Sequence, residues 1–405
     1  MGDDTVNIGF FSDSYEPQKN GVVTAVKTQK IYLEKFGHKV YLVIPNIPNS
    51  PNGNTYKLPS ITFIFQKEHR VAIPYSLKID ILLNKKNLHI IHTHSPFSLG
   101  IFGWQQARKR KIPLVHTYHT LFDEYAYYIW DHFPSFIKKR LIKEDDAKKI
   151  ALWYSLYYSN LCDLIIAPST KVKRILENNN IKVPVEVLPN GIDFKEFKPI
   201  DKKYARIKRG YPLDGILLLF VGRLGKEKNI SYLLNVIRWL KNHSNYPFYL
   251  IIIGDNPNKN IKESLMKEAE KLNILDNVIF TGYLDYQSVI ESYYASDIFV
   301  FSSLTETQGL VVLEALFSGL PVVALKDLAI EDFVINGING FLIANDEKGI
   351  ENFGKKIILL VENRDLYNKI SYNAKKHASS FNLDNMIKMQ IELYENLIKE
   401  RKRYA

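Results

Sequence analysis

Short runs of apolar, β-branched residues alternate with amphipathic helical patterns along the chain, and this alternation starts afresh in the second half. Parallel strands must be joined by crossover segments, so strands separated by helices indicate parallel sheets. The first half contains the expected strands Asn7–Phe11, Val40–Ile44, His89–His92, Leu114–Thr117, Leu164–Ala167 and Val185–Leu188. The second half contains Ile216–Val221, Tyr249–Ile253, Val278–Phe280, Ile298–Phe301 and Pro321–Ala324. The pattern predicts an α/β chain of two similar lobes with a cleft between them.

The boundary between the lobes is marked by a turn and by a change in composition. A length of 405 residues favours two domains. Pro189-Asn190-Gly191 ends one unit, and an apolar-poor stretch leads into Tyr211-Pro212. We therefore expect one lobe over residues 1–195, a second over 196–382, and a last helix over 383–405. The expected apolar face of this helix is Ile387, Ile391, Tyr394, Leu397 and Ile398.

Cysteine content, apolar runs and charge limit the environment and the partners. The single cysteine, Cys162, can form neither an internal disulfide nor a thiolate metal site. The acidic start and the short apolar runs predict no signal peptide and no bilayer span, so we expect a cytoplasmic protein that meets a membrane only from its surface. Residues 1–200 carry 27 Lys and Arg against 18 Asp and Glu, whereas the remainder carries 27 against 25. Most of the positive field thus lies in the first half, which favours an anionic partner.

The strongest chemical signal is the segment Glu306-Thr-Gln-Gly309-Leu310-Val-Val-Leu-Glu314, which follows the strand Ile298–Phe301. It reads as a strand, a polar loop and a helix that begins near Gly309. Backbone N–H groups at such a helix start can bind anionic oxygens, and two carboxylates can hold hydroxyls along one extended ligand. The alternative is an ordinary first-turn acid and a buried salt bridge.

A second polar loop follows the first strand of the second lobe. It reads Gly222-Arg223-Leu-Gly225-Lys226-Glu227-Lys228-Asn229. Arg223 supplies a planar fork and Lys228 a point charge, both suited to a diphosphate. Ligands of open α/β sheets bind at the carboxyl ends of strands, and two polar loops at equivalent ends indicate a shared site.

These two motifs resemble those of the family-4 retaining glycosyltransferases of GT-B fold, which have a Glu-x7-Glu signature and a Gly-Arg…Glu-Lys loop. The resemblance extends over almost the whole chain, including Pro17-Gln-Lys-Asn-Gly21-Val22 and Pro189-Asn190-Gly191-Ile192-Asp193. It implies two Rossmann-like lobes with parallel sheets facing a central cleft, and a C-terminal helix packing back toward the first lobe. It also implies a nucleotide-sugar co-substrate and no required cofactor or metal.

The resemblance further implies a role for each motif residue. Glu306 would hydrogen-bond the donor sugar and Glu314 the ribose hydroxyls, while Arg223 and Lys228 would hold the diphosphate in place of a metal ion. The acceptor hydroxyl would arrive on the leaving-group face, where a phosphate oxygen takes its proton. The expected catalytic residues are His119, Arg223, Lys228 and Glu306, and the expected donor-binding residues are Gly21, Gly254, Tyr283 (near the base), Gly309, Leu310 and Glu314.

Two histidine-containing segments end strands of the first lobe, His92-Thr-His94 and His116-Thr-Tyr-His119. An HxH pair suggests zinc, but no third and fourth ligand stands at a useful spacing, so no metal site is expected. In the resemblance, His119 aligns with a histidine that contacts the donor sugar. The alternative is a hydrogen-bonded structural histidine at a strand end.

A segment after His119 combines aromatic and basic residues. Rings at headgroup level and lysines facing anionic lipid are typical of proteins that lie on a membrane surface. The expected membrane-binding residues are Tyr127, Tyr128, Trp130, Phe133, Lys138, Lys139, Arg140 and Lys143. The alternative is that the rings pack inward and the lysines are solvated.

Three segments resemble the bacterial 1,2-diacylglycerol 3-glucosyltransferase branch of the family: Asn20–Val26, His94–Gly100 and Thr117–Tyr125. This implies transfer of a hexosyl group, glucose from UDP-glucose, to diacylglycerol at the inner face of the plasma membrane. Ser95-Pro96 departs from that branch, where several enzymes have Thr-Glu, and relatives with soluble acceptors also use Ser-Pro. A phosphatidylinositol or soluble-glycan glycosyltransferase therefore stays open, as does a nucleotide-sugar epimerase of GT-B shape. No recognised nucleic-acid-binding module is present, so no nucleic-acid partner is expected.

Overall fold

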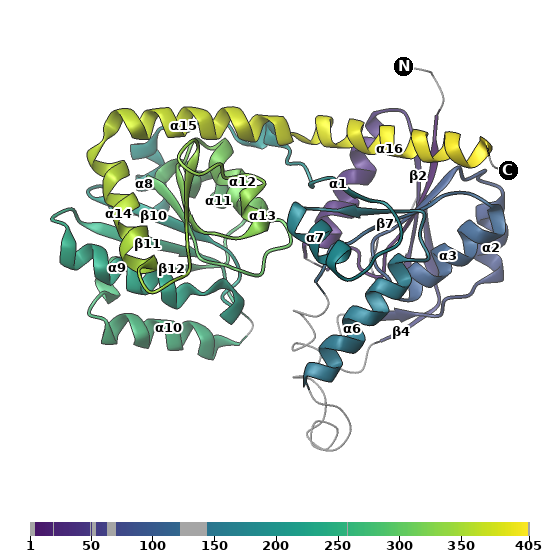
Figure 1. Cartoon of the computed structure of the whole chain (residues 1–405), viewed down its shortest axis with the longest axis horizontal. Coiled ribbons are helices and arrows are strands. Elements are labelled where there is room, and N and C mark those ends of the chain that lie inside the picture. Colours follow the sequence, from purple (N-terminus) through teal and green to yellow (C-terminus); the bar gives the residue numbers. More distant parts are fainter. Residues whose placement is uncertain are drawn as a thin grey trace. The chain divides into compact units, whose positions relative to one another are not determined.

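The computed structural model describes residues 5–18, 20–48, 50, 54–62, 70–121, 144–256 and 258–403. The chain forms two compact units (Figure 1). Unit 1 is Met1–Gly191 together with Leu383–Ala405, and unit 2 is Ile192–Asn382. The last helix therefore belongs to the first unit, although it follows the second unit in the chain.

Unit 1 is built on a parallel sheet of seven strands in the order β3-β2-β1-β6-β7-β8-β9. Its strands are β1 (Asn7–Phe11), β2 (Lys39–Pro45), β3 (Thr55–Leu58), β6 (Ile90–Thr93), β7 (Leu114–Thr117), β8 (Leu164–Ala167) and β9 (Val185–Val187). A small antiparallel pair consists of β4 (Ser60–Thr62) and β5 (Arg70–Ala72). The described helices are α1 (Gly21–Lys35), α2 (Leu77–Asn84), α3 (Ser98–Arg110), α6 (Glu144–Ser159), α7 (Thr170–Asn178) and α16 (Leu383–Arg403).

Unit 2 repeats this arrangement with six parallel strands in the order β12-β11-β10-β13-β14-β15. Its strands are β10 (Ile216–Val221), β11 (Phe248–Ile253), β12 (Val278–Gly282), β13 (Ile298–Phe301), β14 (Val322–Leu325) and β15 (Gly340–Ile343). Its α-helices are α8 (Lys202–Arg209), α9 (Ile230–His243), α10 (Lys259–Lys271), α11 (Tyr286–Ala295), α12 (Leu310–Phe317), α13 (Leu328–Glu331), α14 (Gly349–Glu362) and α15 (Arg364–Ala378). Short 3₁₀ turns are η1 (Phe194–Glu196), η2 (Lys226–Lys228), η3 (Leu275–Asn277) and η4 (Ser379–Phe381).

The predicted fold class is confirmed, because each unit is a parallel sheet with helical crossovers. The central strands are buried along their whole length, as in β13 and β14, and such strands are continuously apolar. This property made them recognisable in the sequence. The strand order reverses between β1 and β6 in unit 1 and between β10 and β13 in unit 2. Ligands of open α/β sheets bind at the carboxyl ends of strands beside such a reversal.

Helix α16 packs on unit 1, alongside α1 (Figure 1). Asp384 of α16 forms an ion pair with Lys35 of α1, with Nζ and Oδ1 2.8 Å apart. The buried face differs in part from the expected one. Gln390 and Tyr394 are 2% and 1% exposed, whereas Ile391 is only partly buried. Gln390 can be buried because its side-chain amide donates hydrogen bonds to Gln29 and to the Tyr394 hydroxyl.

Candidate active site

In unit 2, the loop after β10 presents the expected cations. Arg223 lies two residues after the end of β10, and its Nη2 lies 2.6 Å from Oε1 of Glu227 in the turn η2. Burial would raise the pKa of Glu227, but its hydrogen bonds to backbone and to Arg223, with the charges of Arg223 and Lys228, hold that pKa below its ordinary value. Glu227 therefore stays ionised and holds the guanidinium in place.

Lys228, at the end of η2, forms an ion pair with Glu306 from the loop after β13. The lysine and glutamate side chains are 17% and 13% exposed, so both charges are largely removed from water. Ser302 and Ser303 donate hydrogen bonds to the carbonyl oxygens of Lys228 and Glu227, at 2.8 and 3.2 Å. The loops on either side of the strand-order reversal are therefore bound to each other.

Helix α12 begins at Leu310, directly after Gly309, whose backbone is left-handed with φ of +75°. A Cβ at Gly309 would lie 2.7 Å from Cδ1 of Ile330, so any other residue would be both strained and crowded. Cγ of Glu306 lies 3.8 Å from the same Cβ position, so the side chain of Glu306 packs against the residue that precedes α12. This is the arrangement that the sequence predicted for binding anionic oxygens.

Glu314 lies in the second turn of α12 and accepts two tyrosine hydrogen bonds. Tyr293 donates at 2.8 Å and Tyr286 at 3.2 Å. Burial raises the pKa of Glu314 to about 7, although both hydrogen bonds act in the opposite direction. Neither tyrosine was expected from the sequence, since nothing in the spacing shows which rings of α11 face α12.

Gly254 directly follows β11 and allows close packing of the backbone against the loop after β10. Its φ is +136°, and a Cβ there would lie 2.0 Å from the carbonyl oxygen of Gly222. Tyr283 follows β12 and is 70% exposed. Gly21 is the first residue of α1 in unit 1, and a Cβ there would meet no atom within 4 Å. Its position is therefore spacious.

In unit 1, histidines gather at the carboxyl ends of β6 and β7. Nδ1 of His94 lies 3.1 Å from Nε2 of His119. Nδ1 of His92 lies 2.5 Å from the Tyr394 hydroxyl of α16, and Nδ1 of His116 lies 3.0 Å from the carbonyl oxygen of Thr93. Burial lowers the pKa of His119 to about 3 and that of His116 to about 4, and it holds those of His92 and His94 well below the ordinary value. All four rings are thus neutral at physiological pH.

Asp13, two residues after the end of β1, was not among the expected site residues. Ser95 donates a hydrogen bond of 2.6 Å to its Oδ2, and the backbone N–H of Leu99 donates to its Oδ1 at 3.2 Å. Burial raises the pKa of Asp13 to about 6 despite these bonds. Its position just after β1, a strand beside the reversal of strand order, is the feature of the sequence that could have indicated it. Asp13 therefore binds a backbone N–H in the first turn of α3 and holds the side chain of Ser95.

Comparison with known proteins identifies the family. Residues 19–196 match the model for Glycosyltransferase Family 4, and residues 201–377 match that for Glycosyl transferases group 1. An alpha-monoglucosyldiacylglycerol synthase from Streptococcus pneumoniae is 34% identical over 327 residues, which are 79% of this chain and 71% of that protein. The chain belongs to the family-4 glycosyltransferases.

Two further proteins have the same organisation over nearly the full length of this glycosyltransferase. An alpha-monoglucosyldiacylglycerol synthase from Acholeplasma laidlawii is 28% identical over 97% of this chain and 98% of its own. The structure of a sucrose-phosphate synthase from Thermosynechococcus elongatus superposes with a TM-score of 0.75 at 19% identity, covering 98% of this chain and 100% of its own. The predicted GT-B fold is therefore confirmed.

Within the glycosyltransferase, unit 2 brings Arg223, Lys228, Glu306, Gly309 and Leu310 together at one strand-order reversal. His119 and Gly21 lie in unit 1. The eight expected membrane-binding residues lie between 122 and 143, outside the described residues. Among the described residues, no group of three or more His, Cys, Asp or Glu side chains is arranged to hold a metal ion. In that same part of the chain, no helix is both long and apolar enough to cross a bilayer.

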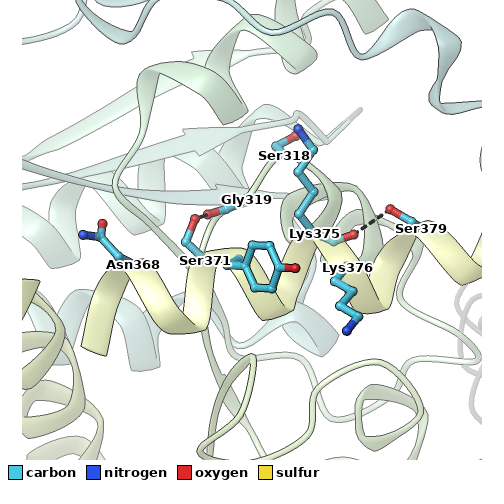
Figure 2. A pocket seen from close by; sticks show the side chains of 8 residues that line it. Ser318, Gly319, Asn368, Ser371, Lys375, Lys376 and Ser379 are labelled. Atoms are coloured by element: carbon cyan, nitrogen blue, oxygen red, sulfur yellow. Dashed lines mark hydrogen bonds between the residues drawn. The ribbon is translucent and has the colours of Figure 1, made fainter. Parts of the chain in front are cut away.

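A pocket of about 450 Å³ lies elsewhere on the glycosyltransferase, where the end of α12 meets α15 (Figure 2). Ser371 of α15 donates a hydrogen bond of 2.6 Å to the carbonyl oxygen of Gly319, and Lys375 and Lys376 also line the pocket. Because Glu306 and Gly309 stand at the start of α12, this pocket lies at the opposite end of that helix. It is therefore not part of the candidate active site.

Proposed function

We propose that this glycosyltransferase transfers glucose from UDP-glucose to 1,2-diacylglycerol with retention of configuration, giving a monoglucosyl diacylglycerol. The observation that carries the donor half is the pairing of two cations with two carboxylates around β10 and β13. The acceptor half is supported by two relatives named alpha-monoglucosyldiacylglycerol synthase, one 34% identical and one matching nearly end to end.

At the donor site, Arg223 and Lys228 hold the diphosphate. As the bond from the anomeric carbon to the diphosphate oxygen breaks, negative charge grows on the leaving group, and cations held in position stabilise that charge. This lets the reaction proceed without a metal ion. Glu306 accepts hydrogen bonds from the sugar hydroxyls, and Glu314 accepts them from the ribose.

The acceptor hydroxyl attacks the anomeric carbon from the face that the diphosphate leaves. The new bond joins that carbon to the acceptor oxygen, and the hydroxyl proton passes to an oxygen of the departing diphosphate. No protein base is required for this step. Attack and departure on one face retain the configuration of the sugar.

An exposed apolar surface of unit 1 supports the proposal that the acceptor is a membrane lipid. Apolar side chains are exposed on one face of the β4–β5 pair and on the chain leading into α2. These are Ile61 (66% exposed), Val71 (40%), Ile73 (52%), Tyr75 (68%) and Leu77 (60%). Apolar patches of this kind on a protein surface mark interaction sites. We name this set the β4–β5 surface.

The charges near the β4–β5 surface favour an anionic membrane. Residues 70–87 contain Arg70, Lys78, Lys85 and Lys86 but only one acid, Asp80. Asp80 is buried and paired with Lys109 and Arg110. The exposed charge of this region is therefore positive. We propose that the enzyme works from the cytoplasmic side, bound to the inner face of the plasma membrane.

The test is incubation of the purified protein with radiolabelled UDP-glucose and a panel of acceptors: diacylglycerol, phosphatidylinositol and soluble sugars. Organic extraction should recover the label with diacylglycerol only. Label in phosphatidylinositol or in a soluble sugar would show that diacylglycerol is not the specific acceptor, while the proposed transferase activity would still hold. Conversion of UDP-glucose to another nucleotide sugar without transfer would overturn both.

A further inference from the structure

His94 and His119 form a partly buried hydrogen bond at the carboxyl ends of β6 and β7, with 3.1 Å between Nδ1 and Nε2. His94 is only 2% exposed. Its ring packs against Phe10 and His92, at centroid distances of 4.7 and 4.2 Å. The His94 ring is therefore fixed in position and has no access to bulk water.

The hydrogen bond between the two neutral rings needs one N–H and one lone pair. If His94 is protonated on Nδ1, it donates to Nε2 of His119, and its own Nε2 retains an unpaired lone pair. If His94 is instead protonated on Nε2, that N–H is buried without an acceptor, because Nε2 of His94 has no hydrogen-bond partner in the described part of the chain. Buried N–H groups without a partner are rarer than unsatisfied acceptors. The first arrangement is therefore favoured.

The neighbouring ring of His92 is fixed by a chain of bonds that leads to α16. The amide of Gln390 donates to the Tyr394 hydroxyl, so the hydroxyl hydrogen is directed to Nδ1 of His92. His92 must then carry its proton on Nε2, from which it donates to Oγ1 of Thr117 at 2.7 Å. His92 thus has both nitrogens satisfied, which leaves His94 to bond His119.

We propose that His94 is a positioning residue that holds His119 as its Nδ1–H tautomer. Nε2 of His119 accepts from His94, so the remaining proton is on Nδ1, to which no described residue is hydrogen-bonded. The proposal rests on the proposed function in one respect: Nδ1–H of His119 donates to an oxygen of the transferred hexosyl group. A neutral donor suits this role, because the sugar gains positive charge in the transition state and an imidazolium would repel it.

The test is a two-bond ¹H–¹⁵N correlation spectrum of the full-length protein labelled at histidine, with His119 assigned by substitution. Wild type should show both His94 and His119 protonated on Nδ1. In His94→Leu, the His119 tautomer should shift toward Nε2–H, and kcat should fall about tenfold, as expected for one lost hydrogen bond. His94→Asn, whose amide can donate from a similar position, should restore both the Nδ1–H tautomer and most of kcat.

The matched control is His116→Leu, which removes a buried histidine that hydrogen-bonds Thr93 instead of His119. It should leave the His119 tautomer unchanged. The proposal is wrong if His119 carries Nε2–H in wild type, or if His94→Leu leaves its tautomer unaltered. If His94→Leu does not fold, the tautomer of His119 in the wild-type and His94→Asn spectra still tests the proposal. The spectra need no substrate, so an error in the proposed function would affect only the kcat result.

Discussion

Lys228 and Glu306 form an ion pair that joins the loops after β10 and β13. One is the cation proposed for the diphosphate and the other the carboxylate proposed for the sugar. Both side chains are mostly buried, and the lysine backbone is fixed by the hydrogen bond from Ser302. The two side chains are thus already held in position in unit 2 before the donor binds, which reduces the side-chain reorganisation that donor binding requires.

The first prediction concerns this cluster. Arg223→Ala, Lys228→Ala and Glu306→Ala should each lower turnover by about 10²- to 10³-fold, because each removes a contact that strengthens as charge develops. The measurement is steady-state kinetics beside thermal unfolding. Lys226→Ala is the matched control, since Lys226 is an exposed lysine of the same turn. A folded Arg223→Ala protein with near-wild-type kinetics would refute the assignment.

The second prediction concerns protonation of Glu314, whose pKa burial raises from 4.5 to about 7. Ribose hydroxyls donate hydrogen bonds and so favour the carboxylate. UDP-glucose binding should therefore release a proton near pH 7, and affinity should fall as the pH drops below 7. Calorimetry in buffers of different ionisation enthalpy measures the release, and Glu314→Gln should abolish it.

A related substitution tests the cause of this pKa. Tyr293→Phe removes the 2.8 Å hydrogen bond that lowers the pKa of Glu314, so the midpoint of the affinity profile should move to higher pH. The raised pKa of Glu314 also makes the folding stability depend on pH. The folded-state pKa lies above the ordinary value, so the stability contributed by Glu314 should decline as pH rises from 4.5 to about 7. Wild-type binding without proton release at pH 7 would contradict this account.

The third prediction is that EDTA leaves most of the transferase activity intact. Arg223 and Lys228 already supply two fixed positive charges for the diphosphate. Activity is measured by label transfer after dialysis against chelator. Complete loss of activity that Mg²⁺ or Mn²⁺ restores would show that the two side chains alone do not stabilise the leaving diphosphate sufficiently.

The fourth prediction concerns membrane binding. Sedimentation with vesicles should increase with phosphatidylglycerol content and decrease with added salt. Ile73→Ser combined with Leu77→Ser should weaken it by removing exposed apolar area, and replacing Lys138, Lys139, Arg140 and Lys143 by Ser should weaken its electrostatic part. Both variants should bind UDP-glucose in solution as wild type does. Equal sedimentation of wild type and both variants would rule out these two sets of residues as the membrane contact.

The central strands and the loops that follow them could be predicted because buried parallel strands are continuous apolar runs. Ten of the eleven expected strands agree with the structure to within one residue at each end, and the eleventh, β12, extends two residues further, to Gly282. The strands that were missed are short or lie at sheet edges. β3 (Thr55–Leu58) has three of its four residues only partly buried, so its pattern is mixed. An edge strand needs less apolar surface than a central one.

Partners from distant parts of the chain could not be predicted in the same way. Tyr293 and Glu314 stand 21 positions apart, and His92 and Tyr394 stand 302 apart. Their contacts depend on how α11 and α16 pack, which local periodicity does not specify. The motif residues were found because loops after parallel strands meet at one edge of a sheet, whereas side chains reaching them from helices were not.

The configuration of the product tests the central claim most directly. Wild-type protein would be incubated with UDP-glucose and diacylglycerol in phosphatidylglycerol vesicles, and the extracted glycolipid examined by ¹H NMR at the anomeric position. Retaining transfer to the lipid predicts an α-linked glucosyl diacylglycerol, with the small anomeric coupling of an axial glycosidic bond. A β-linked glycolipid would contradict the retaining mechanism, and glucose released only into water would contradict lipid transfer itself.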